Sequence, residues 1–338
     1  MNNKMMKYIS VIVLLAVCIF LGSTLDDQNK EATQSLFAMD TYMEITAYGR
    51  NSERAVEAAA DEIKRLDALL STGSQTSEVT ALNKDKTGTL SDDTAYLFAR
   101  SQEINRDTDG AFDITIYPVM RAWGFTGEGF RVPSEEELST LTDAVDMTQL
   151  FYENGVLTIP DNMEIDFGGI AKGYTSEHVA KIMEQYGIKS AKLNLGGNVQ
   201  TIGAKPDKRA WKIAIKSPDE SEAYLGIVSV MDKAVVTSGG YERYFEQDGV
   251  TYHHIIDPAT GKPAQNGLVS VTIISGDGTY ADGMSTALFV MGKERAISYW
   301  KSHREQFDFV LLDESGKMYV SEGIEKDFTS EHEYQIIR

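Results

Sequence analysis

The segment Asp166-Phe-Gly-Gly-Ile-Ala-Lys-Gly-Tyr174 carries residues that could do phosphate chemistry. Its glycine pair lets the backbone approach a bulky ligand, because glycine has no Cβ. Backbone N–H groups at the start of a helix suit phosphate, and Lys172 adds a full positive charge there. The spacings of a P-loop or a dinucleotide-binding fingerprint are absent. The segment is interpreted either as a turn facing phosphate or as an ordinary tight turn with a solvated lysine.

A second segment, Ala281-Asp-Gly-Met-Ser-Thr286, has the residue types of a magnesium site. Asp282 and Thr286 are four residues apart, so they share one face of a helix. A carboxylate, a hydroxyl and a carbonyl or waters form the oxygen shell that Mg²⁺ prefers. The alternative is an acidic residue favoured near a helix start, with Thr286 merely packed.

A third segment places two histidines side by side in Tyr252-His-His-Ile-Ile-Asp257, after Thr237-Ser-Gly-Gly-Tyr-Glu-Arg243. Neighbouring residues on a strand face opposite ways, so His253 and His254 do not suit a shared metal ion. One of them, with Asp257 nearby, could do acid–base work. A purely structural histidine is the alternative.

Two shorter segments are ambiguous on their own. Gly110-Ala-Phe-Asp113 sets a carboxylate beside an aromatic ring, which suits a heterocycle but also a helix stop with a core phenylalanine. Asn194-Leu-Gly-Gly-Asn198 has the composition of a simple turn after a strand.

The elements that must position these residues are helices and strands without regular alternation, which favours an α+β fold. The spacing of apolar residues predicts helices over Ser52–Leu70, Thr94–Thr108, Tyr174–Tyr186 and Ala281–Met291. A capping box at Ser134-Glu-Glu-Glu137 predicts a further short helix. Predicted strands are Leu36–Tyr48, Leu157–Phe167, Ala191–Leu195, Ala210–Lys216, Gly226–Val230, Thr251–Ile256 and Val269–Ser275, with a closing hairpin of Phe307–Leu312 and Lys317–Val320.

Composition narrows the function classes. The 338 residues carry a formal net charge of −19, which argues against nucleic-acid binding. The same charge repels free nucleotides, so a nucleotide substrate would need a local cation. The only cysteine is Cys18, near the N-terminus, so the folded part is predicted to have no disulfide, cysteine nucleophile or thiolate metal site.

The N-terminal segment has the pattern of an export leader. Lys4 and Lys7 precede an apolar run over 8–25, and a polar linker over 26–35 leads into the body, 36–338. Leu15-Ala-Val-Cys18 is similar to a lipoprotein cleavage box, although Val17 stands where a small residue is usual. An uncleaved membrane anchor is therefore an alternative to a lipidated Cys18, and a buried helix is a third reading. The first two place the body at the extracytoplasmic face of the cell membrane.

Taken together and in order, five motifs resemble the ApbE family: DFGGIAKGY, NLGGN, TSGGYERYF, HHIIDPATGKP and ADGMSTALFVMG. The resemblance covers about residues 36–325. It implies an α+β fold of mixed sheets with flanking helices and a ligand cleft between two intimate subdomains. It also implies Mg²⁺-dependent transfer of FMN from FAD to a Thr or Ser hydroxyl, with release of AMP. The acceptor would be an extracytoplasmic subunit of a membrane redox complex.

The resemblance also implies roles for residues of the matching motifs. Asp282 and Thr286 would bind Mg²⁺ with the carbonyl of Gly169, and Ser285 would contribute. His254 would be the acid–base or orienting group. Both His254 and Asp282 would be catalytic residues. The residues implied to contact FAD are Met39, Ala111, Phe112, Asp113, Asp166, Lys172 and Ile256.

One departure from the family pattern bears on FAD affinity. Many relatives carry a tyrosine after Ser-Thr in the first loop, where this chain has Ser71-Thr-Gly73. Two other functions stay open: a hydrolase that cuts FAD into FMN and AMP, and a lipoprotein that binds FAD without chemistry. The retained pair of Asp282 and Thr286 argues against the second.

Overall fold

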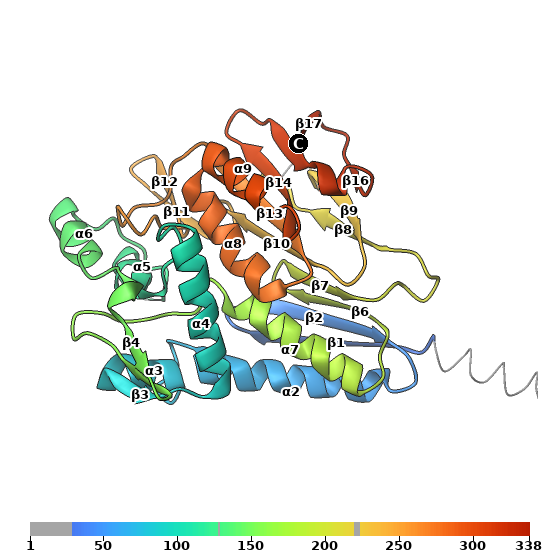
Figure 1. Ribbon diagram of the computed structural model, residues 1–338, viewed down its shortest axis with the longest axis horizontal. Coiled ribbons are helices and arrows are strands. Elements are labelled where there is room, and N and C mark those ends of the chain that lie inside the picture. The colour runs from blue at the N-terminus through green and yellow to red at the C-terminus, as the bar shows by residue number, and fades with distance from the viewer. Residues whose placement is uncertain (1–28, 128, 220–223) are drawn as a thin grey trace, which may run out of the picture.

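The computed structural model describes residues 29–127, 129–219 and 224–338. It confirms the predicted α+β class, with a large central sheet and helices packed on one of its faces (Figure 1). Within these residues the large sheet has nine strands, in the order β1-β2-β6-β7-β10-β13-β14-β15-β17. Neighbours run antiparallel except the last pair, which is parallel. The bounds are β1 Glu31–Ala38, β2 Thr41–Tyr48, β6 Ser190–Leu195, β7 Asn198–Ile202, β10 Ala234–Gly239, β13 Leu268–Ser275, β14 Phe307–Asp313, β15 Met318–Ser321 and β17 Tyr334–Ile337.

The helices follow the apolar spacing of the sequence closely. The prediction over Ser52–Leu70 is confirmed residue for residue in α2, and Ser134 caps α6 by accepting from the backbone N–H of Glu137 at 3.2 Å. The other predicted helices differ only at their ends. The bounds are α2 Ser52–Leu70, α3 Glu78–Asp85, α4 Asp92–Asp107, α5 Tyr117–Trp123, α6 Glu135–Thr142, α7 Ala171–Gln185, α8 Gly278–Met291 and α9 Lys293–Ser302.

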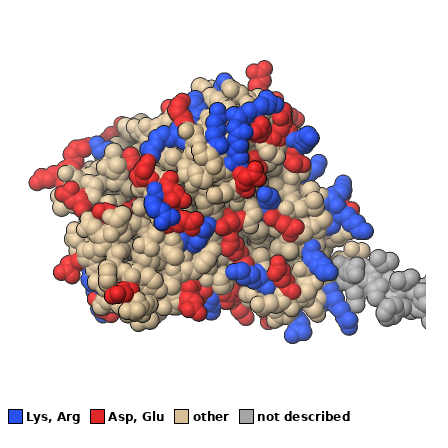
Figure 2. All heavy atoms as spheres, in the orientation of Figure 1, with Lys and Arg blue, Asp and Glu red and all other residues tan. Residues whose placement is uncertain are grey.

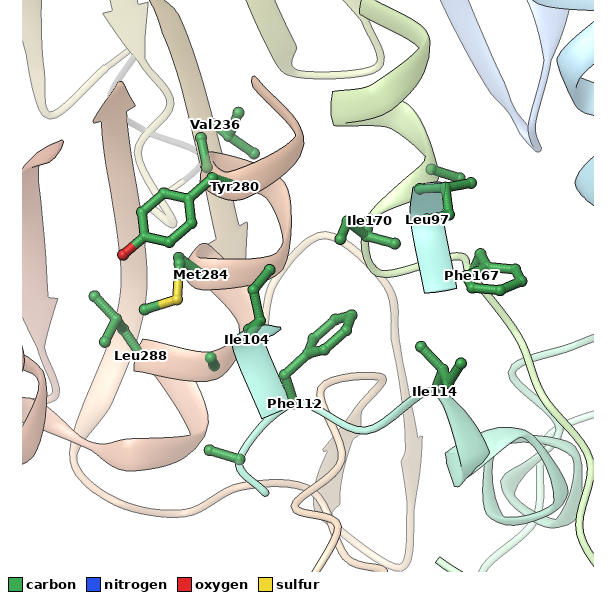
Figure 3. Packing of buried hydrophobic residues seen from close by; sticks show 14 of the residues in the cluster. Leu97, Ile104, Phe112, Ile114, Phe167, Ile170, Val236, Tyr280, Met284 and Leu288 are labelled. Carbon is green, nitrogen blue, oxygen red and sulfur yellow. The ribbon is translucent and has the colours of Figure 1, made fainter. Parts of the chain in front are cut away.

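Three hydrophobic clusters fill the space around the large sheet. The first joins α4, α8 and α9 to β10, β13 and β14, and Figure 3 shows Ile104 lying between Met284 of α8 and Phe112. The second joins α2 and α7 to the strands at the β1 end. The third lies under a small sheet of β8 (Trp211–Ile215), β9 (Gly226–Val230) and β16 (Phe328–Thr329). These layers fix the strand ends from which the site is built.

A fourth, smaller cluster stands apart from the large sheet and is called here the satellite cluster. Its buried members are Val119, Trp123, Phe125, Leu138 and Ile256, and it packs α5 and α6 against the hairpin of β11 (Tyr244–Gln247) and β12 (Val250–His253). These elements lie at the left edge of Figure 1. The fold therefore has a small hydrophobic core of its own beside the main one, and the two subdomains that the resemblance implies stay a prediction.

Several strand predictions need correction. The segment predicted as one strand, 36–48, is part of the β1–β2 hairpin, which turns at Met39 and Asp40. β1 already begins at Glu31, inside the predicted linker. The predicted strand ending at Ile256 stops at His253, and β7 and β10 were not predicted as strands.

The predicted strand over 157–167 is also wrong. Only β5 (Val156–Thr158) is a strand, paired with β3 (Thr87–Thr89) and β4 (Phe151–Glu153). The apolar side chains beyond it are buried, but the Asn83 side-chain amide bonds both the N–H and the carbonyl of Ile165, at 2.7 and 2.8 Å. A side chain here takes over the bonds that a neighbouring strand would make.

Acidic and basic side chains are interspersed over the face shown in Figure 2. Across the described residues, no helix is long and apolar enough to cross a membrane. The predicted leader over 1–25, including Cys18, lies outside those residues.

Candidate active site

One cavity of about 680 Å³ gathers nearly all the residues singled out from the sequence. This volume falls within the usual range for small-molecule sites, roughly 300–1,000 Å³. Of the predicted site residues only Ser285 is absent from its walls. Those that line it are Met39, Ala111, Phe112, Asp113, Asp166, Gly169, Lys172, His254, Ile256, Asp282 and Thr286.

Asp282 lies where α7 and α8 cross. The helices meet so closely that a Cβ on Gly173 would lie 2.2 Å from the carbonyl oxygen of Gly278. This contact lets Asp282 Oδ2 accept a hydrogen bond of 2.8 Å from the Gly173 N–H. The carboxylate of one helix therefore caps the first turn of the other. Because that N–H is already paired, it does not serve phosphate, and the Lys172 side chain carries the positive charge at this end of the cavity.

The environment of Asp282 acts on its charge in two opposite directions. Its side chain is 6% exposed, and burial raises the pKa of the carboxyl group. The nearby Lys172 ammonium and the Gly173 N–H act in the opposite direction and favour the charged form. A cation that binds here would meet a carboxylate with little competing water.

Thr286 and Ser285 differ in availability, although they are neighbours on α8. Thr286 lines the cavity, and its hydroxyl lies 3.4 Å from the Ser238 hydroxyl. Ser285 donates to the carbonyl of Asp282 at 2.8 Å and pairs with the Ser238 hydroxyl at 2.8 Å. Ser285 is fully buried behind the wall, so its predicted part in metal binding is not supported by its position.

The remaining donors fit magnesium. Asp282, Thr286 and Gly169 supply a carboxylate, a hydroxyl and a backbone carbonyl, which are the hard oxygen ligands that Mg²⁺ binds alongside water and substrate phosphates. Among the residues described, no three His, Cys, Asp or Glu side chains form a metal cluster. A Mg²⁺ ion with few protein ligands needs no such cluster, because it usually keeps several waters.

Asp166 stands opposite two cations on the cavity wall. Its Oδ1 accepts from the Gly168 N–H at 3.0 Å. Burial raises the pKa of its carboxyl group, while Lys172 and Arg243 favour the charged form. Arg243 also lines the cavity and donates to the carbonyl of Phe125 at 2.5 Å. Arg243 is thus a second cation of the site, which the sequence contained but which was not singled out.

His254 presents one free ring nitrogen to the cavity. Its Nδ1 lies 3.1 Å from the carbonyl oxygen of Arg243, and only a protonated Nδ1 can form this bond. The Nε2 of the neutral ring therefore carries the lone pair. Burial, together with the Arg243 charge, lowers the pKa of His254 to about 3. The imidazole is neutral at neutral pH and can accept a proton at Nε2.

His253 uses both of its ring nitrogens within the protein. Its Nε2 lies 3.1 Å from the carbonyl of Ala264, and its Nδ1 accepts from the Ile255 N–H at 3.2 Å. The ring packs edge-on against Phe289, 5.5 Å between centroids. His253 is thus a structural residue, and burial lowers its pKa as well.

The rim contains a strained turn. Met39 and Asp40 both have positive φ, 48° and 58°, as the two central residues of the β1–β2 hairpin. Such turns normally contain asparagine or glycine, so methionine here is unusual and costs free energy. The sulfur of Met39 accepts from the Thr175 hydroxyl at 3.8 Å, which ties the turn to α7.

Ala111, Phe112 and Asp113 all line the cavity wall, and two of them also hold the loops around it. A Cβ on Gly169 would lie 2.9 Å from the Phe112 ring, so the ring presses on the backbone there. Asp113 accepts four hydrogen bonds from the protein: two from Thr115, one from Asn105 and one from the Met147 N–H. Its carboxylate therefore holds the loop together, and its predicted contact with FAD stays a prediction.

Two further observations complete the site. Asn198 lines the cavity beside Asp282, although sequence reasoning assigned its motif only to a turn. Ser71 and Gly73 of the first loop are not among the residues that line the cavity.

Comparisons with known proteins identify the family of this chain. The ApbE family profile matches residues 39–311. The FAD:protein FMN transferase of Vibrio cholerae is 33% identical over 268 residues, which is 77% of this chain and 80% of that protein. The FAD:protein FMN transferase of Escherichia coli is 32% identical over 273 residues, which is 76% and 78% of the two chains. The crystal structure of the ApbE protein of Thermotoga maritima superposes with a TM-score of 0.83 at 32% identity, covering 88% of this chain and 99% of that one. The chain therefore belongs to the ApbE family.

Proposed function

We propose that this protein transfers FMN from FAD to a Thr or Ser hydroxyl of an acceptor protein, with Mg²⁺, and releases AMP. The observation that carries the proposal is the meeting, in one cavity, of an oxygen donor set, the cationic side chains of Lys172 and Arg243, and a histidine with a free Nε2. The curated relatives from Vibrio cholerae and Escherichia coli are named for this activity.

Phosphoryl transfer is catalysed mainly by positioning the reacting groups and by neutralising the charge of the phosphates, and the residues of the cavity suit both tasks. Asp282, Thr286 and the Gly169 carbonyl would hold Mg²⁺, which offsets negative charge on the pyrophosphate. Lys172 and Arg243 bring positive charge to a cavity in a protein of net charge −19. These positive charges in the cavity offset the long-range electrostatic repulsion between an acidic protein and an anionic nucleotide.

The acceptor hydroxyl must lose its proton during the transfer, so the site needs a group that accepts it. As the acceptor oxygen bonds to the FMN phosphorus, the bond from that phosphorus to the bridging oxygen breaks, and AMP leaves with that oxygen. The hydroxyl proton passes to Nε2 of His254. The Arg243 carbonyl, through Nδ1, holds the imidazole in the tautomer that this step requires.

The test is incubation with FAD and an extracytoplasmic redox subunit, followed by denaturing electrophoresis and flavin fluorescence. We expect a fluorescent acceptor band with Mg²⁺ and none with EDTA. Asp282→Ala should also give no band, whereas Asp257→Ala, at a position outside the cavity wall, should give a normal one. An unlabelled acceptor in every lane would contradict the transferase proposal.

The same experiment separates the other two functions. An FAD pyrophosphatase would release AMP and FMN equally with and without the acceptor. An FAD-binding lipoprotein would retain FAD and release no AMP at all. Both would leave the acceptor unlabelled.

We further propose that the acceptor is a subunit of a membrane redox complex, and that the protein is held at the extracytoplasmic face of the cell membrane. The support is the pattern of residues 1–25, a charged start followed by an apolar run with Cys18. Fractionation should find the protein with membranes, and Cys18→Ser should release or misprocess it if the cysteine is lipidated. Membrane retention of Cys18→Ser would favour an uncleaved anchor, and unprocessed protein in the cytosol would contradict both.

A further inference from the structure

Asn198 is a buried amide without a partner at the wall of the active-site cavity. Its side chain is 3% exposed, and neither Nδ2 nor Oδ1 has a hydrogen bond of normal geometry in the protein. Buried polar groups in folded proteins nearly always have partners, because an unpaired one is costly. An amide that stays unpaired beside a ligand cavity therefore indicates a partner that arrives with the ligand.

The backbone holds Asn198 firmly in this place. It is the first residue of β7, directly after the two-glycine turn of the β6–β7 hairpin, where Gly196 and Gly197 have φ of 68° and 95°. The Gly197 N–H donates to the Asn194 side chain at 2.9 Å. A Cβ on Gly196 would lie 2.3 Å from the Thr41 hydroxyl, so the turn is also packed against β2. A rigid turn fixes where the amide points.

The neighbour of this amide is Asp282, which lines the same cavity. Asn198 lies close enough to that carboxyl group to oppose the rise of its pKa, together with Lys172 and Gly173, but the contact falls short of a hydrogen bond of normal geometry. A carboxylate only accepts hydrogen bonds, so the Nδ2 end of the amide must face it. The carbonyl end, Oδ1, is then left without a donor among the described residues.

We propose that Asn198 is a positioning residue at the cation end of the site: its Nδ2 orients the Asp282 carboxylate, and its Oδ1 accepts a hydrogen bond from a water of the bound cation. This inference rests on the proposed function for the identity of the cation. Groups that hold metal ligands and metal-bound waters in place commonly alter metal affinity 10–100-fold when removed.

The test uses direct Mn²⁺ binding, measured by electron paramagnetic resonance of the free ion, with no FAD and no turnover. Asn198→Leu keeps the shape of the side chain and removes both polar atoms. Gln200→Leu is the matched control, because Gln200 lies two residues along the same strand face, is 6% exposed and also has an unpaired oxygen, but does not line the cavity. We expect Mn²⁺ affinity to fall about 10–100-fold in Asn198→Leu and less than about threefold in Gln200→Leu.

A structural role would give a different pattern. If the amide served only the fold, both variants would bind Mn²⁺ like the wild type, and replacing an unpaired buried amide by leucine would leave stability equal or higher. Wild-type Mn²⁺ affinity in folded Asn198→Leu overturns the inference. If Asn198→Leu does not fold, Asn198→Ala, which adds no bulk, takes its place. Wild-type Mn²⁺ affinity in folded Asn198→Ala would then overturn the inference.

Asp282→Ala separates this inference from the proposed function. Loss of Mn²⁺ binding in Asp282→Ala with normal binding in Asn198→Leu would overturn only the role of Asn198. Normal binding in Asp282→Ala, or no Mn²⁺ binding by the wild type, would contradict the cation site itself.

Discussion

The two ends of the cavity are built in different ways. At the cation end, Asp282 stands on α8 and Lys172 on α7, two helices whose backbones touch and which belong to the main core. At the proton end, His254 follows the short β11–β12 hairpin and is positioned by the carbonyl of Arg243 and by the satellite cluster. The first end depends on long helices and close packing, and the second depends on one loop carbonyl and a few aromatic rings. Substitutions at the first should therefore affect chemistry and stability together, whereas at the second the two effects should separate between neighbouring residues.

The largest effect is expected at the cation end. Asp282→Ala removes the only carboxylate of the proposed magnesium ligands, and metal-ion catalysis typically supplies several kcal/mol. Transfer should fall by orders of magnitude. Because the Gly173 N–H loses its acceptor in a buried place, the free energy of unfolding should also fall, by about 1–3 kcal/mol. Steady-state rates and urea unfolding measure the two effects, and full activity at low Mg²⁺ would refute the assignment.

A smaller effect is expected at the proton end, where adjacent histidines give an internal control. His254→Ala should reduce FMN transfer by about 10²–10⁴-fold, the usual contribution of a general base, and leave FAD binding intact. His253→Ala breaks only structural bonds, to Ala264 and Ile255, so it should lower stability more than transfer. Transfer assays and FAD titrations compare the two. Equal transfer rates would mean that neither histidine takes the proton.

Packing at the helix crossing gives the third prediction. Gly173→Ala would place a Cβ 2.2 Å from the Gly278 carbonyl, and overpacking of this kind costs about 1–3 kcal/mol. Moving α7 away from α8 should also weaken metal binding, because the Gly169 carbonyl, just before α7, would move away from Asp282 and Thr286 on α8. Gly276→Ala is the control, since its Cβ would meet no atom within 4 Å. Thermal unfolding and Mn²⁺ titration compare the two; equal melting temperatures would show that the crossing is not tight.

The smallest effect concerns pH. Since the folded pKa of His254, about 3, lies below its ordinary 6.5, the unfolded chain takes up this proton first. The stability linked to this histidine is therefore present above about pH 6.5 and is lost as pH falls towards 3. NMR of the ring should show His254 neutral down to pH 5, with His254→Ala assigning the signal. A midpoint near 6.5 in the folded protein would contradict the buried, Arg243-facing environment.

The sequence anticipated the cation end better than the proton end. Helical spacing is a local signal, so the α2 bounds and the Asp282–Thr286 face could be read from the chain directly. The strand predicted over 251–256 is too long. In the structure β12 ends at His253, which pairs with Tyr244, so His254 lies just beyond the strand. Arg243 and Asn198 were not singled out, since their importance comes from contacts with Asp166 and Asp282 that are distant in sequence.

Asp113, Ser285 and the segment over 157–167 show the limits of motif reasoning. A motif places a residue near a site, but it does not tell whether the side chain is already occupied. Asp113 has four protein donors, and Ser285 is bonded to Asp282 and Ser238. Likewise, the buried apolar run after Thr158 satisfies its backbone through Asn83 rather than through a neighbouring strand.

The most direct test of the account counts products in a single turnover. With enzyme in excess of FAD, and with Mg²⁺ and an acceptor subunit present, AMP is measured by chromatography and acceptor-bound FMN by mass spectrometry of the intact protein. Transfer at this site predicts one AMP for each FMN bound to the acceptor, at a Thr or Ser. AMP and free FMN in equal amounts with an unmodified acceptor would contradict it.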